Sequence, residues 1–364
     1  NGTIDNVQVW DTVYGNAQIS SLYSYPLTGP VLYSTQHYGG ANGHIGFALS
    51  KALVERGYNV RASVRDKTDP NLVSHLSSLD VEIVELDLMQ PETIEAAMNG
   101  IEGLFQVAAV YKSWAWDPEE EIINPSIIGG INALKAARNA NVKKVIFTSS
   151  TAAIGRSGPG GRALTEADWN SASKHPYSYA KTEAERRAWD YAKAVDMNVV
   201  VINPTAVIGP YFHRHTPSTL LFDKILKGEL KSLPPQTFGY VDVRDVALGH
   251  ILAYENENAE GRHILCTQCV NGFELMDLIE EIDPELEVPR KIEPMWKIRL
   301  FARLEATRAI FGHTPRITPQ TVKEYMGKIT NYDSSKARGV LGWNPMDLKD
   351  SIRDTINWIR HNLS

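Results

Sequence analysis

Short apolar runs and longer helical patterns alternate along the chain from about Pro30 onward. Continuous apolar runs are typical of strands buried on both faces, and apolar residues that recur every three to four positions are typical of amphipathic helices. The predicted strands are 31–38, 58–64, 81–86, 103–109, 143–148 and 197–203, and the predicted helices are 45–56, 91–99, 119–140 and 177–195. Strands that alternate with helices predict an α/β fold with a doubly wound parallel sheet.

A glycine-rich turn, residues 40–46 (GANGHIG), joins the first predicted strand to the first predicted helix. Glycines let the backbone turn tightly, and they let a pyrophosphate approach the amides at a helix N-terminus, where the dipole favours negative charge. The turn follows a strand, opens a helix and precedes a second strand, which is the context that a dinucleotide-binding turn requires. The strand before it, with LYSTQHY at 32–38, is more polar than a strand buried on both faces should be.

A tyrosine and a lysine share one face of the last predicted helix. Tyr177 and Lys181 lie four residues apart, so their side chains project from the same side. A phenol titrates near 10, and an ammonium one turn away favours the phenolate and lowers that pKa. Such a pair would transfer a proton to or from a carbonyl or an alcohol. The same spacing is common on solvated helix faces, so both interpretations stay open on this pair alone.

The end of the second predicted strand bears on the choice of dinucleotide. A cofactor without a 2'-phosphate, NAD, calls for a carboxylate here, and Asp66 is a candidate. The last strand position is instead the apolar Val64, and it is followed by Arg65, whose guanidinium matches a 2'-phosphate by bidentate hydrogen bonding. The pattern favours NADP(H) over NAD(H), with a solvated Arg-Asp turn as the alternative.

Three further strand ends carry candidate contacts. Asp87 and Leu88 follow the third strand, where a carboxylate can accept a hydrogen bond from an adenine amino group and an apolar neighbour can cover the ring. An ordinary aspartate at a strand end explains Asp87 nearly as well. The fourth strand leads into the small residues Val107 and Ala108, against which a cofactor could lie. Ser150 follows the fifth strand, and hydroxyls at the carboxyl end of a parallel strand lie at the ligand crevice.

Composition excludes several classes of function. The chain has 364 residues, 43% of them hydrophobic and 22% charged, which is ordinary for a globular protein. Its net charge of -6 comes without a basic run, so we expect no nucleic-acid partner. No stretch approaches about 18 consecutive apolar residues, so we expect no membrane span and a cytoplasmic location.

The two cysteines, Cys266 and Cys269, form a Cys-x-x-Cys arrangement. With no second pair and no nearby histidine cluster, a zinc site would lack ligands. Residues 262–266 predict a strand, whereas a thioredoxin-like motif would begin a helix. We therefore expect two reduced cysteines and no metal site.

Taken together and in this order, the motifs resemble the extended short-chain dehydrogenase/reductase family. The resemblance is to its dihydroflavonol-reductase-like branch, which includes cinnamoyl-CoA reductases and hydroxysteroid dehydrogenases. It rests on residues 40–46, 60–66 (VRASVRD), 147–150 (FTSS), 177–181 (YSYAK), 203–210 (NPTAVIGP), 241–247 (VDVRDVA), 332–338 (YDSSKAR) and 341–343 (LGW). It departs at Gly39, where the family usually has threonine, and in the polar first strand.

The resemblance implies a Rossmann-type sheet with NADP(H) as cofactor. It implies that Ser150 polarises the substrate, that Tyr177 is the general acid/base, and that Lys181 lowers the pKa of the tyrosine and holds the nicotinamide ribose. The cofactor contacts that it implies, together with those at the strand ends, are Gly40, Gly43, His44, Ile45, Gly46, Arg65, Asp87, Leu88, Val107, Ala108, Tyr177, Lys181, Pro204 and Val207. Among them, His44 and Ile45 would bind the pyrophosphate through their amides.

The implied domain organisation has three parts. Residues 1–30, rich in Asn, Thr, Ser, Tyr and Gly, are an extension that the resemblance does not cover. Residues 31–205 form the dinucleotide-binding domain. Residues 206–364 form mainly a smaller substrate-binding region, with some segments that return to the sheet.

The expected activity is reduction of a ketone or aldehyde, or the reverse oxidation of the alcohol. Aromatic residues are the candidate substrate contacts, although core packing explains each of them as well; these are Tyr111, Trp114, Tyr211, Phe212, Tyr240 and Trp296. One alternative is an NAD-dependent nucleotide-sugar epimerase, which shares the fold and the triad. The other is a non-catalytic dinucleotide sensor, against which an intact Ser-Tyr-Lys set argues. The expected partner is a small carbonyl or alcohol substrate, and the protein is a monomer or a homodimer.

Overall fold

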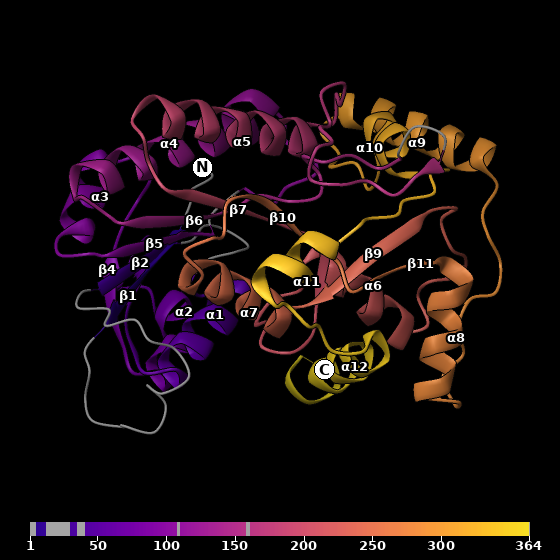
Figure 1. Cartoon of the computed structure of the whole chain (residues 1–364). Coiled ribbons are helices and arrows are strands. Elements are labelled where there is room, and N and C mark those ends of the chain that lie inside the picture. Colours follow the sequence, from indigo (N-terminus) through magenta and orange to yellow (C-terminus); the bar gives the residue numbers. More distant parts are fainter. Residues whose placement is uncertain (1–4, 12–29, 35–40, 108–109, 158–160, 364) are drawn as a thin grey trace.

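The computed structural model describes residues 5–11, 30–34, 41–107, 110–157 and 161–363. A large sheet crosses the molecule and is covered by helices on both faces (Figure 1). Helices α3, α4 and α5 lie on one face, and α1 and α7 lie on the other (Figure 1). Their bounds are α1 His44–Glu55, α3 Pro91–Met98, α4 Asn124–Asn139, α5 Pro176–Ala194 and α7 Val243–Glu255, and the short α2 is Pro70–Val73.

The sheet has eight strands in the order β10-β7-β6-β5-β1-β2-β3-β4, and β2 also pairs directly with β5. The strands are β1 Asp5–Asp11, β2 Pro30–Ser34, β3 Tyr58–Val64, β4 Val81–Glu85, β5 Gly103–Gln106, β6 Lys144–Thr148, β7 Val199–Pro204 and β10 Gly261–Leu265. All pairings except those of β1 are parallel. Without β1, the order reverses between β2 and β5, as in the dinucleotide-binding doubly wound sheet. The predicted fold class is therefore confirmed.

Several boundaries differ from the sequence prediction. β2 ends at Ser34 and β5 at Gln106, while residues 35–40 and 108–109 lie outside the described residues. Helix α4 is preceded by a π-helical turn, Glu119–Ile123, where one continuous helix was predicted. Pro125 has no amide hydrogen for the regular helical bond at this point, which accounts for the irregular turn.

Part of the segment 1–30 lies in the sheet. No strand was predicted there, but Asp5–Asp11 forms β1, antiparallel to β2, β3 and β5. Apart from β1 and Pro30, this segment lies outside the described residues.

A second, smaller sheet is built from residues after β7. It has the order β11-β9-β8, with β8 Ala206–Ile208, β9 Thr237–Asp242 and β11 Gln268–Asn271. Helices α6 Pro217–Leu226, α8 Gly272–Ile282 and α12 Leu348–Asn362 surround it and share its apolar core. The remaining helices are α9 Met295–Ile310, α10 Pro319–Tyr325 and α11 Ser335–Leu341. Among the described helices, none is long and apolar enough to cross a bilayer.

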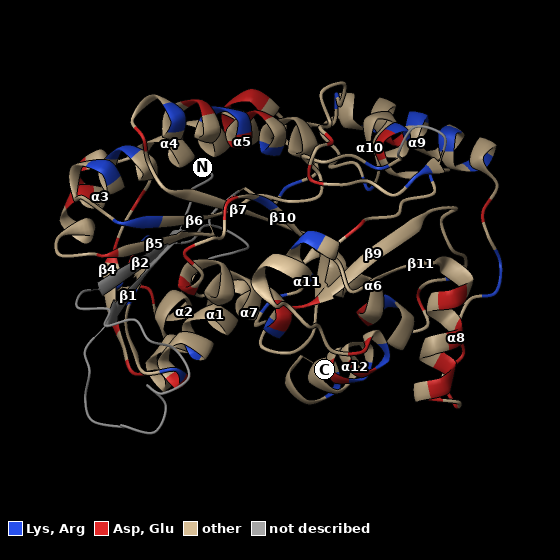
Figure 2. Cartoon of the chain, in the orientation of Figure 1, with Lys and Arg blue, Asp and Glu red and all other residues tan. Residues whose placement is uncertain are grey.

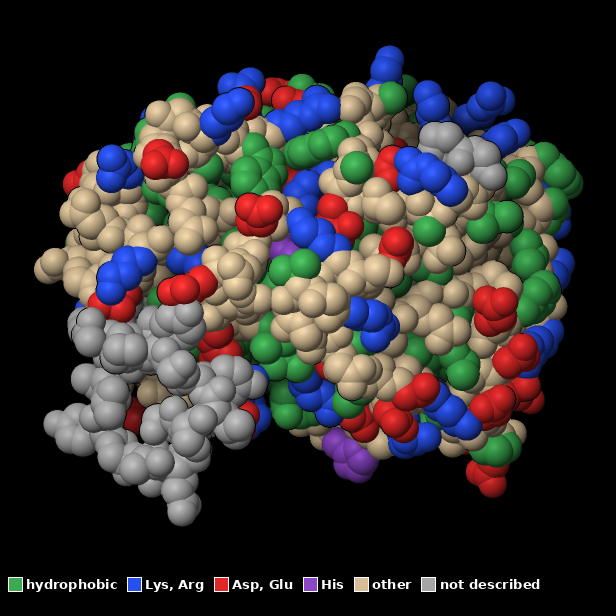
Figure 3. Space-filling model, viewed as in Figure 1, with side chains coloured by type: hydrophobic (Ala, Val, Ile, Leu, Met, Phe, Trp, Pro, Cys, Tyr) green, Lys and Arg blue, Asp and Glu red, His purple; other side chains and the backbone are tan. Residues whose placement is uncertain are grey.

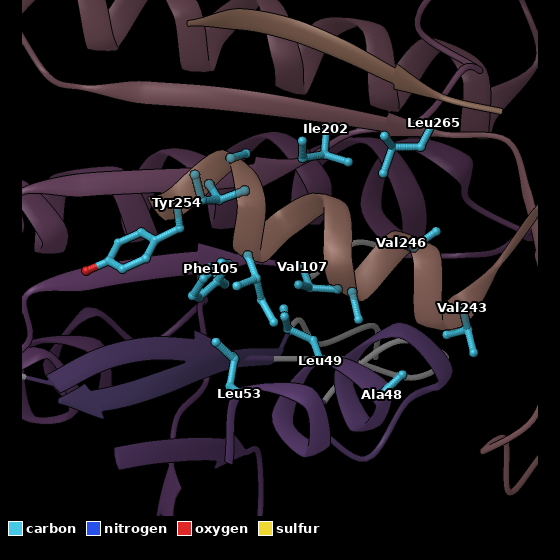
Figure 4. Packing of buried hydrophobic residues seen from close by; sticks show 14 of the residues in the cluster. Ala48, Leu49, Leu53, Phe105, Val107, Ile202, Val243, Val246, Tyr254 and Leu265 are labelled. Carbon is cyan, nitrogen blue, oxygen red and sulfur yellow. The ribbon is translucent and has the colours of Figure 1, made fainter. Parts of the chain in front are cut away.

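Helices α1 and α7 pack together under the main sheet (Figure 4). Leu49 and Leu53 of α1 share one buried cluster with Val246 and Tyr254 of α7 and with Phe105 of β5. The ring of Tyr254 lies so close to β5 that a Cβ at Gly103 would come within 2.3 Å of it. Because α1 is fixed by this packing, its N-terminus is held at the edge of the sheet where β6 and β7 end.

Candidate active site

A cavity of about 460 Å³ lies between the carboxyl ends of the main strands and the second sheet. One wall comes from the end of β6, the end of β7 and the first turns of α1 and α5, and the other comes from β8, β9, α6 and α10. The predicted residues that line it are His44, Ile45, Val107, Tyr111, Ser150, Tyr177, Lys181, Pro204, Val207 and Tyr240. The structure thus brings the three proposed catalytic residues and part of the proposed cofactor site into one space.

Tyr177 is placed by the start of α5. His175 precedes the helix and Pro176 is its first residue, a position where proline costs no hydrogen bond. The Tyr177 ring packs against the Tyr111 ring with 5.1 Å between centroids. Burial raises the pKa of the Tyr177 phenol, and a hydrogen bond with Ser150 acts in the opposite direction. Burial has the largest effect on this pKa, and the lowering expected from Lys181 stays a prediction.

Lys181 is held one turn further along α5. Its Nζ donates to the Thr148 carbonyl at the end of β6, 3.2 Å away. Burial lowers the pKa of Lys181 to about 8, and the Glu185 carboxylate opposes that shift. Thr148 is fixed in turn by a 2.7 Å hydrogen bond between its Oγ1 and Nε2 of His250, whose pKa burial lowers to about 4. The lysine is thus anchored to the strand end beside the tyrosine.

The hydroxyl of Ser150 accepts one hydrogen bond from the backbone, and its own proton can still be donated to a substrate oxygen. Its Oγ accepts the Ala152 amide at 3.1 Å, and its carbonyl accepts a hydrogen bond from Asn203 at 3.2 Å. The neighbouring Ser149 Oγ is buried without a partner among the described residues. Two hydroxyls therefore follow β6 at the cavity, and of the two it is Ser150 that acts to lower the pKa of the Tyr177 phenol.

The N-terminus of α1 forms the cofactor end of the cavity. Gly43 precedes the helix, and no described side chain caps it. The first amides of a helix have no partner within the helix, so those of His44, Ile45 and Gly46 suit an anion. The His44 ring has a further role that the motif did not predict. Its Nε2 lies 2.8 Å from the Pro210 carbonyl, which ties α1 to the loop after β8, and burial lowers its pKa to about 4.

Arg65 and Asp66 follow β3, as predicted. Asp66 Oδ1 accepts both the amide and the hydroxyl of Thr68, at 2.8 and 2.6 Å, so its carboxylate stabilises the local turn. Arg65 is therefore the better candidate for binding the group at the 2' position of the adenosine ribose. Val64 is fully buried in the core, so it does not face a cofactor.

The other predicted contacts lie in different surroundings. Asp87 is partly exposed and accepts the Met89 amide at 2.8 Å. Leu88 is fully buried in the core, so its side chain does not lie at a surface where it could cover a ring. Gly40 and Ala108 lie outside the described residues.

Four of the six predicted aromatic substrate contacts do not line the cavity. Trp114 packs on Trp116, with ring centroids 4.7 Å apart. Tyr211 and Phe212 pack against Trp358 of α12, at 5.6 and 6.4 Å. Trp296 lies on α9 and is 64% exposed. Of the six aromatic candidates, only Tyr111 and Tyr240 line the cavity.

Sequence reasoning missed several lining residues. They are contributed by loops and short elements far apart in the chain, so no local motif marks them; among them are Arg156, Thr216, Ser218, Leu221, Gln236, Thr321, Tyr325 and Thr330. Arg156 adds a cation to the substrate side of the cavity. No group of three or more His, Cys, Asp or Glu suited to a metal occurs in the described part of the chain, and Cys266 and Cys269 are both free.

Known proteins identify the family. The NAD dependent epimerase/dehydratase family matches residues 39–266. Cinnamoyl-CoA reductase CAD2 of Medicago truncatula is 34% identical, over 69% of this chain and 82% of its own length. The putative dihydroflavonol 4-reductase of a Synechocystis strain is 30% identical, over 88% of this chain and 93% of its own.

Solved structures agree. The crystal structure of gox2253 is 29% identical with a TM-score of 0.77, over 89% of this chain and 98% of its own. Gre2 from Candida albicans, solved in complex with NADPH, is 28% identical with a TM-score of 0.70 over the same shares. The chain belongs to the NAD dependent epimerase/dehydratase family, in the dihydroflavonol-reductase-like branch of the extended short-chain dehydrogenase/reductases.

Proposed function

We propose that the protein is an NADP(H)-dependent reductase of ketones or aldehydes that also runs in reverse as an alcohol dehydrogenase. The observation that carries this proposal is the meeting of Ser150, Tyr177 and Lys181 at one cavity that also contains the N-terminus of α1. The relatives named as reductases, and the NADPH complex of Gre2, support the same reaction class and cofactor.

The side chains fit the reductive direction. A bound nicotinamide supplies or accepts the hydride. Burial keeps the Tyr177 phenol protonated at neutral pH, so it can donate its proton to the carbonyl oxygen of a substrate. The Ser150 hydroxyl holds that oxygen by a second hydrogen bond. Lys181, with a pKa of about 8, carries a proton at neutral pH and offers an ammonium to a ribose hydroxyl.

The second sheet and its helices supply the substrate side in this proposal. β8, β9, α6 and α10 line the cavity opposite α5. Residues 206–364 therefore contribute most of the substrate-binding region, while β10 and α7 return to the main sheet.

A panel of ketones and aldehydes, assayed by nicotinamide absorbance with NADPH and NADH side by side, tests the proposal. We expect turnover with at least one carbonyl class and a preference for NADPH. Interconversion of sugar nucleotides without net change in absorbance would instead identify an epimerase. Binding of NADPH without either reaction would identify a dinucleotide sensor.

Arg65→Ala should weaken NADPH binding and leave NADH binding nearly unchanged. A charge-assisted contact to a 2'-phosphate is worth about 1.5–3 kcal/mol, or about 10- to 150-fold in affinity. Titration by nicotinamide fluorescence measures both cofactors. Asp66→Ala is the matched control, because this neighbour is exposed and its carboxylate accepts hydrogen bonds from Thr68. Equal losses for both cofactors in Arg65→Ala would mean that Arg65 only shapes the turn.

A further inference from the structure

Arg156 places a positive charge in the wall of the cavity. Its guanidinium carbon lies 4.3 Å from the centre of the Tyr325 ring, and its Nε is buried without a hydrogen-bond partner among the described residues. No carboxylate in the described part of the chain forms an ion pair with it. Burial of a cation is costly unless an anion or several hydrogen bonds compensate it.

The one carboxylate whose charge acts on Arg156, that of Glu324, is already hydrogen-bonded elsewhere. Glu324, beside Tyr325, accepts from Asn170 and Ser173, both at 2.9 Å. Glu324 acts on Arg156 only through the longer-range electrostatic field. The aromatic ring of Tyr325 stabilises the cation but cannot neutralise it.

The charge also lies within reach of the reacting groups. Arg156 lines the same cavity as Tyr111 and Tyr177, and its field acts on both phenols. A ligand with its carbonyl at Tyr177 would therefore extend toward the guanidinium if it filled the cavity.

We propose that Arg156 binds an oxyanion of the substrate, so that the protein acts on carbonyl compounds that also carry a carboxylate or a phosphate. The proposal rests on the proposed reductase function and names its substrate class. The planar guanidinium presents paired N–H donors, which match either oxyanion. The Tyr325 ring fixes the plane of the fork and reduces the entropy lost when the anion binds.

The test compares aldehydes that differ only in charge. 4-Formylbenzoate and 4-formylphenyl phosphate carry the two oxyanions, and methyl 4-formylbenzoate is the neutral control. We expect kcat/KM to be higher for at least one anion than for the ester. In Arg156→Gln this preference should fall by about 10- to 150-fold, the value of a charge-assisted contact. Arg156→Lys should restore part of it.

Arg162→Gln is the matched control variant, because Arg162 is exposed and pairs with Asp168. Its anion preference should equal that of the unchanged protein. Equal kcat/KM for anions and ester in the unchanged protein, or equal losses for all three in Arg156→Gln, would overturn the proposal. Calorimetric binding of the same probes in the presence of NADP⁺ separates the two claims. If the anionic probes bind in a way that depends on Arg156 but are not reduced, the proposed reductase function is refuted and the oxyanion site is retained.

A second, independent observation concerns α9. Eight of the fifteen large apolar side chains exposed in the described residues lie between Ile292 and Ile329. Trp296, Leu300 and Leu304 are spaced by four, so they form one row along the helix, and they are 64%, 51% and 55% exposed. Hydrophobic side chains gather at this end of the molecule in Figure 3. We call these three residues with Phe311, which continues the row, the α9 strip.

Basic residues border the α9 strip on both sides. By the helical period, Lys297 and Arg308 fall on one side and Arg299 and Arg303 on the other. Lys297 pairs with Glu293 at 3.7 Å and Arg308 with Glu305 at 3.0 Å. The basic character therefore rests mainly on Arg299 and Arg303. The single acid of the helix, Glu305, is buried on the opposite face. Figure 2 shows the contrast with α8, whose charged residues are all acidic.

We infer that the α9 strip docks on an anionic membrane surface. An exposed apolar row with tryptophan and phenylalanine, flanked by cations, is typical of helices that lie in the bilayer interface. A second copy of the chain is a poorer occupant, because paired strips would bring the flanking cations together. Helix α9 packs on α10, whose Thr321 and Tyr325 line the cavity, so docking would set the cavity near the lipid.

Co-sedimentation with vesicles of phosphatidylcholine, with and without phosphatidylserine, tests this inference. We expect binding only with phosphatidylserine, reduced at least tenfold by Leu300→Glu with Leu304→Glu. Arg299→Gln combined with Arg303→Gln should lower the affinity for these vesicles by about 30-fold, because each cation near such a surface contributes about 1 kcal/mol. Phe273→Glu changes another exposed apolar residue, on α8, and should leave vesicle binding unchanged. Lack of binding, or a dimer that the Leu300 variant dissociates, would refute the lipid assignment.

Discussion

Tyr177→Phe should lower turnover by about two to four orders of magnitude and leave NADPH affinity nearly intact. The general acid is lost, while the ring still packs against Tyr111 at 5.1 Å between centroids. Steady-state kinetics with the best carbonyl from the panel, together with NADPH titration by fluorescence, gives both quantities.

The same helix supplies the control for this experiment. Tyr179 lies two residues further on and is 42% exposed, so Tyr179→Phe removes a hydroxyl on the outer side of α5. Its turnover should equal that of the unchanged protein. A Tyr177→Phe variant that retained more than about a tenth of the turnover would refute the acid/base assignment.

Arg262→Met should lower the free energy of unfolding by about 3–5 kcal/mol, because it leaves a buried carboxylate unpaired. Arg262 pairs with Glu185, and the two side chains are 7% and 0% exposed. Arg262 also donates to the carbonyls of Glu166 and Asp168, at 2.8 and 2.6 Å, and lies over the Trp169 ring. Urea denaturation followed by circular dichroism measures the change.

Two further variants show whether the loss of stability in Arg262→Met comes from the unpaired carboxylate. Glu185→Leu combined with Arg262→Met removes both charges and should be less destabilised than Arg262→Met alone. Arg290→Met removes an exposed guanidinium that pairs with Asp277 and should cost at most about 1 kcal/mol. A double variant as unstable as Arg262→Met would show that the packing of the arginine, rather than the orphaned charge, accounts for the loss.

The main sheet could be predicted because its signals are local. Each strand such as β3 or β7 is a short apolar run, and α1 and α5 begin at residues that mark helix starts, Gly43 and Pro176. The Ser150, Tyr177 and Lys181 set is likewise marked by short motifs. The fold then brings these motifs together, because parallel strands end at the same edge.

Burial could not be read from spacing. The distance from Tyr177 to Lys181 along the helix predicts a lowered pKa for the phenol, yet burial raises it. Leu88 follows from strand position as a cofactor neighbour, yet its side chain lies in the core. A strand end specifies the edge of the sheet, but the packing of helices on each face decides which side chains remain accessible.

The second sheet and the substrate side were not predictable in the same way. β8 and β11 have three and four residues, too few for a periodic signal. Arg156 and Tyr325 are separated by more than 160 positions in the chain and meet only through the loops that carry them. Such contacts depend on the whole topology, which no local pattern encodes.

The way α7 and β10 return to the main sheet limits how this protein can be recombined. The ring of Tyr254 on α7 packs directly against Gly103 of β5, and β10 pairs with β7 in the main sheet. A chimaera joined by a single crossover at residue 205 would exchange not only the substrate side but also half of the core beneath the sheet. Transfer of specificity from a relative is therefore better done by grafting separate inserts, such as β8 with α6 and α10 with its flanking loops, while the host keeps its own α7 and β10.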